Sequence, residues 1–212
     1  MAGVFSVNVV GYVNKTVPAE NFAVLSVPLN YTGSGGNNIT NVVGGTIPDG
    51  TVLITVAPGG VFDDPETYFD GFGWFPGTAV LPPGKAFFIK PTGAQAAITF
   101  VGDVLQGTTT NEIPAGTSLT GSTVPQSLPL GDAASSAATT LQFPAVDGDN
   151  YIAWDVSTQG YKDPVTYFNG YGWFDSGVNG PGPVEGPAPA VAEGFFVEKL
   201  APASWIRTLN VQ

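Results

Sequence analysis

Short apolar runs alternate with clusters of glycine and proline along almost the whole chain. The runs are rich in valine, isoleucine, threonine, phenylalanine and tyrosine, as in AFFIK at residues 86–90 and AAITFVGDVL at residues 96–105. β-Branched and aromatic residues suit the pleated surface of a strand, and glycine and proline are turn residues. No stretch keeps a helical period over three turns. The pattern therefore predicts an all-β chain.

The N-terminal run VFSVNVVGYV alternates most clearly. Successive side chains of a strand point to opposite faces, so Phe5, Val7 and Val9 form an apolar row that needs a core to cover it. Two arrangements follow from this need. The strand either pairs with a different subunit, which joins copies head to tail, or folds back onto its own domain, which gives a self-contained monomer. We predict the first arrangement, with Phe5, Val7 and Val9 as the assembly strand.

A twelve-residue segment occurs twice in the chain. DPETYFDGFGWF at residues 64–75 and DPVTYFNGYGWF at residues 163–174 are identical at nine of their twelve positions. The flanking matches pair residues 17–19 with 113–115, 48–50 with 146–148, and 86–89 with 194–197. A duplication of this extent predicts two tandem β-sandwich-like domains, residues 1–107 and residues 108–212.

The N-terminal run also resembles AAITFVGDVL and, more weakly, ASWIRTLNVQ at residues 203–212. Two domain bodies bounded by three copies of one strand leave a terminal strand without an obvious role in its own domain. Such a strand can complete the sheet edge of a neighbouring molecule, and an uncovered edge is a liability. The surplus strand therefore favours self-assembly.

Three segments carry a resemblance to known proteins: SVNVVGYVNKTVPA, PPGKAFFIKPTG and ITFVGDVLQGT. They resemble segments of uncharacterised secreted tandem-repeat β proteins of Verrucomicrobia and related bacteria. The resemblance implies export and a β-sandwich-like fold, and it supplies no catalytic residue. The chain departs from the pattern at Lys85-Ala86, where Glu-Gly is usual, and keeps it at Glu193-Gly194. Since the first residues have no signal-peptide pattern, export implies a signal already removed.

Composition excludes several classes of function. The chain has a net charge of −11 with only six lysines and arginines, so it repels nucleic-acid backbones and anionic lipid surfaces. Histidine and cysteine are both absent, which removes imidazole bases, thiolate nucleophiles and the commonest zinc ligands. No apolar run is long enough to span a bilayer. No carboxylate pair has a spacing that indicates a glycosidase. We expect a non-enzymatic protein without a cofactor.

The repeated aromatic segment offers two interpretations. Tyr68, Trp74, Tyr167 and Trp173 could form exposed platforms for sugar rings. Alternatively, they are core residues beside hairpin turns, because Asp-Gly and Asn-Gly are dipeptides that type I′ turns prefer. We adopt the second interpretation. Acidic residues near residue 64 suggest calcium ligands, but no DxDxDG spacing is present, so we predict a solvated loop and no metal.

These observations predict a secreted structural protein at the bacterial cell surface or outside the cell. Its copies would form a filament, surface layer or matrix by pairing of strands, so the expected partner is a second copy of the chain. The alternative is a monomeric carbohydrate-binding or adhesive module with a polysaccharide partner. The platform interpretation of the four aromatic residues belongs to this alternative.

Overall fold

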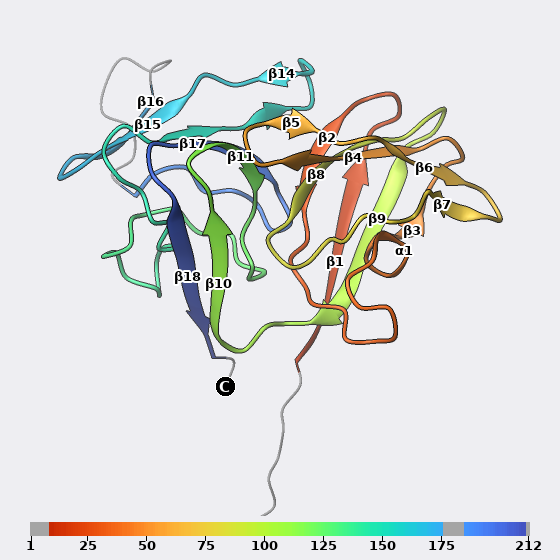
Figure 1. Ribbon diagram of the computed structural model, residues 1–212, viewed down its shortest axis with the longest axis horizontal. Coiled ribbons are helices and arrows are strands. Elements are labelled where there is room, and N and C mark those ends of the chain that lie inside the picture. Colours follow the sequence, from red (N-terminus) through yellow and green to blue (C-terminus); the bar gives the residue numbers. More distant parts are fainter. Residues whose placement is uncertain (1–8, 176–184, 211–212) are drawn as a thin grey trace, which may run out of the picture.

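The computed structural model describes residues 9–175 and 185–210. This part of the chain forms eighteen β-strands and a single four-residue helix, α1 (Ile39–Val42). All sheet pairings are antiparallel. The predicted all-β class is therefore confirmed. Figure 1 shows the strands gathered in two lobes that lie side by side along the longest axis.

The first lobe packs a small sheet against a larger one. The small sheet has the order β1-β9-β3, and the larger has the order β2-β8-β4-β6-β7 with β5 paired to β4. A core of buried aliphatic and aromatic residues lies between them, with Ile98 and Phe100 from the small sheet and Phe87 and Ile89 from the larger. The strands are β1 (Val10–Val17), β2 (Ala23–Ser26), β3 (Gly44–Thr46), β4 (Val52–Ala57), β5 (Val61–Phe62), β6 (Glu66–Phe69), β7 (Gly73–Phe75), β8 (Ala86–Lys90) and β9 (Ala96–Asp103).

The second lobe repeats this plan with fewer strands in its small sheet. Its small sheet has the order β10-β18, its larger sheet has the order β11-β17-β12-β15-β16, and β13 pairs with β14. Trp173, Phe195 and Trp205 are in the core between them. The strands are β10 (Gly107–Ile113), β11 (Gly116–Thr120), β12 (Asn150–Ile152), β13 (Trp154–Asp155), β14 (Gly160–Tyr161), β15 (Val165–Phe168), β16 (Gly172–Asp175), β17 (Phe195–Lys199) and β18 (Ala203–Leu209).

A third core joins the two lobes. Val24, Val56, Ala86 and Phe88 of the first lobe pack against Leu119 and Phe196 of the second. Backbone hydrogen bonds cross the seam in matched pairs: the Ser26 N–H donates to the Ala192 carbonyl at 3.0 Å, and the Gly121 N–H donates to the Gly84 carbonyl at 2.9 Å. The bridges Leu25 to Glu193 and Lys85 to Thr120 are likewise matched. Each lobe therefore contributes equivalent positions to the seam.

The structure corrects one sequence-based prediction about the N-terminal strand. Strand β1 pairs along its whole length with β9 of the same chain, from Val10 opposite Asp103 to Val17 opposite Ala96. Residues 10–13, predicted to pair with another subunit, therefore belong to the first lobe, because Val13 and Val17 pack against its core. The central strand β9 is the partner of β1, as β18 is of β10, so no strand of the described residues is surplus. Phe5 and Val7 lie outside the described residues, whereas Val9 is half-buried and accepts a hydrogen bond from the Val104 N–H at 2.8 Å.

Candidate functional sites

The repeated aromatic segment forms a hairpin in each lobe. In β6–β7 Tyr68 pairs with Trp74, and in β15–β16 Tyr167 pairs with Trp173. The two ring pairs have nearly equal centroid separations, 5.5 and 5.4 Å. The glycines of the turns, Gly71 and Gly170, have φ of +76° and +78°. The preceding Asp70 and Asn169 are not in the left-handed region, so the turns fit type II rather than the expected type I′.

The four rings singled out from the sequence are mainly core residues. Trp74, Tyr167 and Trp173 are buried, and Tyr68 is half-buried. The Trp173 indole N–H donates to the Gly131 carbonyl at 2.9 Å. The Tyr167 hydroxyl donates to Asp132 at 2.9 Å, and burial together with this hydrogen bond raises the pKa of Tyr167 to about 12. The three buried rings therefore offer no face to a sugar, which is a correction to the platform interpretation.

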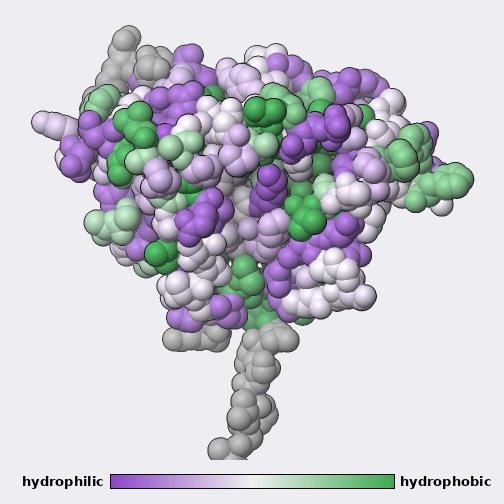
Figure 2. Space-filling model, in the orientation of Figure 1, coloured by the Kyte–Doolittle hydropathy of each residue, from purple (hydrophilic) through white to green (hydrophobic). Residues whose placement is uncertain are grey.

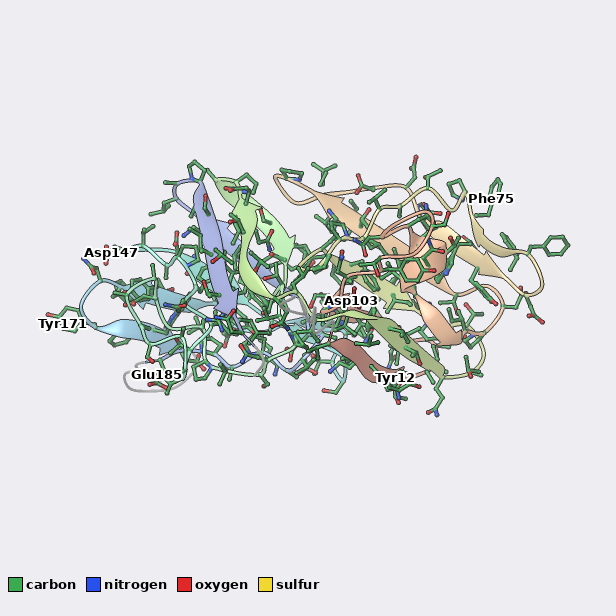
Figure 3. The ribbon with its side chains drawn as sticks, turned by 90° about the horizontal axis from the view of Figure 1, so that it is seen from below. Tyr12, Phe75, Asp103, Asp147, Tyr171 and Glu185 are labelled. Atoms are coloured by element: carbon green, nitrogen blue, oxygen red, sulfur yellow. The ribbon has the colours of Figure 1, made fainter. Side chains whose placement is uncertain are left out.

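The hairpins expose a different set of rings, which the sequence reasoning missed. The exposed fractions are 93% for Phe72 and 72% for Tyr171, the matched residues at the two tips. Figure 3 places Phe75 and Tyr171 at opposite ends of the molecule, and Figure 2 shows apolar residues at the end formed by β6 and β7. The signal was available for Phe69, Phe75 and Phe168, because residues that alternate with inward-facing strand residues must face outward. Phe72 and Tyr171 lie in the turns, where alternation does not apply. The exposed set is Phe69, Phe72, Phe75, Phe168 and Tyr171.

The acidic residues near the hairpins hold the backbone in place. Both oxygens of the buried Glu66 carboxylate accept hydrogen bonds from successive backbone N–H groups of residues 77–79. Asp49 accepts from the Asp70 N–H at 2.8 Å, and Asp147 accepts from the Asn169 N–H at 2.9 Å. In the part of the chain that the structure describes, no three acidic side chains gather as a metal-binding group.

The second small sheet has an edge where the first has a third strand. In the first lobe β3 pairs with β9. The segment at the matching place in the second lobe, residues 142–144, forms no ladder with β18. Phe143 is fully buried, Gln142 has φ of +50°, and proline at position 144 has no N–H to donate. A groove of about 290 Å³ lies here, lined by Ala133, Gln142, Pro144, Ser204, Ile206 and Thr208.

A second groove crosses the seam between the lobes. It has a volume of about 390 Å³ and is lined by Gly60, Phe62, Thr117, Ile152, Tyr161, Lys162, Pro164, Phe196 and Glu198. Phe62 and Tyr161 are each about half exposed, at 52% and 54%. The Tyr161 ring packs edge-on against both Trp154 and Phe196. Burial raises the pKa of the Tyr161 hydroxyl above its ordinary value, so it is a neutral donor near pH 7.

Among the described residues, no helix has the length and apolar character needed to cross a membrane. Comparisons with family models, curated proteins and solved structures found no match to the chain.

Proposed function

We propose that this chain is a structural subunit of an extracellular filament, surface layer or matrix in bacteria. Copies join by strand addition: residues 4–8 of one copy pair with the free edge of β18 in the next. The observation that carries the proposal is the small sheet of the second lobe. Among the described residues, it has one strand fewer than that of the first, and it is bordered by a groove.

The edge of β18 has the properties of a strand acceptor. Every second residue of an edge strand directs its N–H and C=O groups away from its only partner. Among the described residues, no backbone hydrogen bond joins β18 to any strand other than β10. Ser204, Ile206 and Thr208 lie along the groove. An incoming strand would supply the missing backbone partners and place alternate side chains in the groove.

The N-terminal segment fits this acceptor as the donor. It carries Phe5 and Val7 at alternate positions, and burying each such side chain contributes on the order of 1.5–3 kcal/mol. Figure 1 shows that β10 lies between β18 and β1, so the free edge of β18 faces away from the start of β1. We therefore assign the donor segment to a second copy.

The test compares the wild-type chain with Phe5→Asp/Val7→Asp by sedimentation velocity over a range of concentrations and by negative-stain microscopy. We expect concentration-dependent polymers for the wild type and monomers for the double variant. Ser6→Asp/Asn8→Asp is the matched control, because it adds the same charge on the other face of the strand, and it should still assemble. Far-UV circular dichroism checks that all three chains are folded. A wild type that stays monomeric, or a double variant that assembles normally, would overturn the proposal.

A monomeric adhesive module is the second candidate. The exposed rings of the hairpin tips favour it, above all Phe72 and Tyr171, because exposed aromatic side chains are common anchors at binding surfaces. In this case the wild type is monomeric, and Phe72→Ala/Tyr171→Ala reduces its retention on the target surface.

A further inference from the structure

The two lobes fill matched positions at the seam differently. In the repeat, Phe88 corresponds to Phe196, the third residue of AFFI and GFFV. Ala23 pairs with Ile89, the residue after Phe88, and Ser118 pairs with Val197, the residue after Phe196. The residues before Ala23 and Ser118 therefore also correspond, which matches Phe22 with Thr117.

On the first side, a ring of the chain itself occupies the space above Phe88. Phe22 packs edge-on against Phe88, with ring centroids 6.1 Å apart and planes at 85°. The Lys90 ammonium lies 5.7 Å from the centroid of the Phe22 ring. Gln159, the last residue of the β13–β14 turn, donates to the Phe22 carbonyl at 3.0 Å and accepts from the Phe22 N–H at 2.8 Å. A six-membered ring beneath a charged side chain thus closes this side of the seam.

On the second side, both filling residues are replaced by smaller ones. Thr117 stands in place of Phe22, and Gly60, the last residue of the β4–β5 turn, stands in place of Gln159. The result is the 390 Å³ groove, within the size range of small-ligand pockets. It lies above Phe196 as the Phe22 ring lies above Phe88. The groove therefore has room for a ring that the chain does not provide.

The lining combines fixed aromatic faces with a few polar groups. The ring centroids of Phe62 and Phe88 are 5.6 Å apart, and those of Tyr161 and Phe196 are 5.5 Å apart. Packing against these buried rings fixes the positions of both half-exposed rings. Glu198 accepts a hydrogen bond from the Asn150 amide at 3.0 Å, which orients its carboxylate. Lys162 and the Thr117 hydroxyl are further polar groups of the lining.

We propose that the seam groove binds one sugar ring of a neutral polysaccharide. The apolar C–H face of a pyranose packs on aromatic rings, and its hydroxyls pair with a carboxylate, an ammonium and a hydroxyl in the same site. One lysine and one glutamate in the lining balance each other, and the chain as a whole carries a charge of −11, which disfavours an anionic ligand. This site is separate from the edge of β18, so the proposal does not depend on self-assembly.

Affinity electrophoresis tests the proposal in gels that contain soluble β-glucan, xylan or galactomannan, with alginate as an anionic comparison. The assembly-deficient Phe5→Asp/Val7→Asp chain serves as the parent, so that polymer formation does not alter migration. Thr117→Phe fills the groove with the side chain that the first lobe carries at the matched position. Thr117→Ser leaves the groove open, and Tyr12→Ala removes a ring of β1 that is 66% exposed and does not line the groove.

We expect at least one neutral polysaccharide to retard the parent. Thr117→Phe and Tyr161→Ala should weaken the binding about tenfold or more, which corresponds to about 1.4 kcal/mol. Thr117→Ser and Tyr12→Ala should stay close to the parent, and thermal unfolding checks that every variant is folded. No retardation by any of the neutral polymers, equal binding by Thr117→Phe, or retardation by alginate alone would overturn the proposal.

Discussion

Two buried cations distinguish the second core from the first. Lys199 and Asp149 form an ion pair whose side chains are 0% and 1% exposed, and Lys199 also donates to the Pro144 carbonyl. Arg207 lies at the position that Phe100 occupies in the first core, and its guanidinium donates to the Thr140 carbonyl and the Gln126 side chain at 2.9 and 2.8 Å. Desolvation lowers the pKa of Arg207. These groups hold the coil of residues 121–149, which has no strands of its own.

Replacing Lys199 by methionine should lower the free energy of unfolding by about 3–5 kcal/mol, because the Asp149 carboxylate is left buried without its cation. Urea denaturation measures the change. The double variant Asp149→Asn/Lys199→Met should recover part of the loss. Lys90→Met is the matched control, since Lys90 and Glu20 form an exposed pair at 3.5 Å worth at most about 1 kcal/mol. Equal effects of Lys199→Met and Lys90→Met would contradict the expectation.

At the scale of the elements, the main contrast lies between the two small sheets. The segment before the matched Asp-Gly dipeptides forms β3 in the first lobe, where Gly44 and Thr46 pair with β9. In the second lobe the side chain of Phe143, in the corresponding segment, is buried in the core. The segment cannot extend the ladder, because Pro144 has no N–H to donate. This local difference leaves the edge on which the assembly proposal rests.

The hairpins, in contrast, depend on the same backbone geometry in both lobes. Gly71→Ala and Gly170→Ala should each lower the free energy of unfolding by about 1–2 kcal/mol, because a Cβ at these left-handed positions is strained. Neither added Cβ meets another atom within 4 Å, so strain alone sets the cost and the two values should agree. Chemical denaturation measures both. Gly44→Ala is the control, with no positive φ and an ordinary contact at 3.6 Å. Clearly unequal losses would show that the hairpins are not equivalent.

At the scale of the whole molecule, the seam makes the two lobes interdependent. Phe88 is 4% exposed and packs against rings from both lobes, Phe22 and Phe62 on one side and Trp154 and Phe196 on the other. The Trp154 indole N–H also donates to the Phe22 carbonyl across the seam at 2.9 Å. The lobes therefore share apolar burial that neither has alone.

Phe88→Ala should destabilise the chain by about 3–5 kcal/mol, because it opens a cavity at the seam. Scanning calorimetry should show one transition for the wild type, and a lower transition that broadens or splits for the variant as the lobes uncouple. Phe72→Ala, which removes a ring that is 93% exposed, should leave the transition unchanged. A shift for Phe88→Ala no larger than that for Phe72→Ala would contradict the shared core.

The sequence by itself determined the all-β class and the places where the chain turns. Alternation and β-branched composition are local properties, and the Asp-Gly and Asn-Gly dipeptides mark both hairpins correctly. The sequence also indicated that Trp74 and Trp173 are core residues, since both copies keep them beside the turn. It did not indicate the exposed rings, although alternation implied Phe69, Phe75 and Phe168 once the inward residues were known.

Only the tertiary structure decided which strands pair and which surfaces remain open. Strand β1 could have paired with another copy or with β9, because the same alternation satisfies either partner. The partner that it has, residues 96–103, is too distant in the sequence for a local pattern to indicate the contact. The seam groove is lined by residues 60, 117, 161 and 196 from four separate segments. Its shape arises from long-range packing, in which one side has a phenylalanine and a glutamine where the other has a threonine and a glycine.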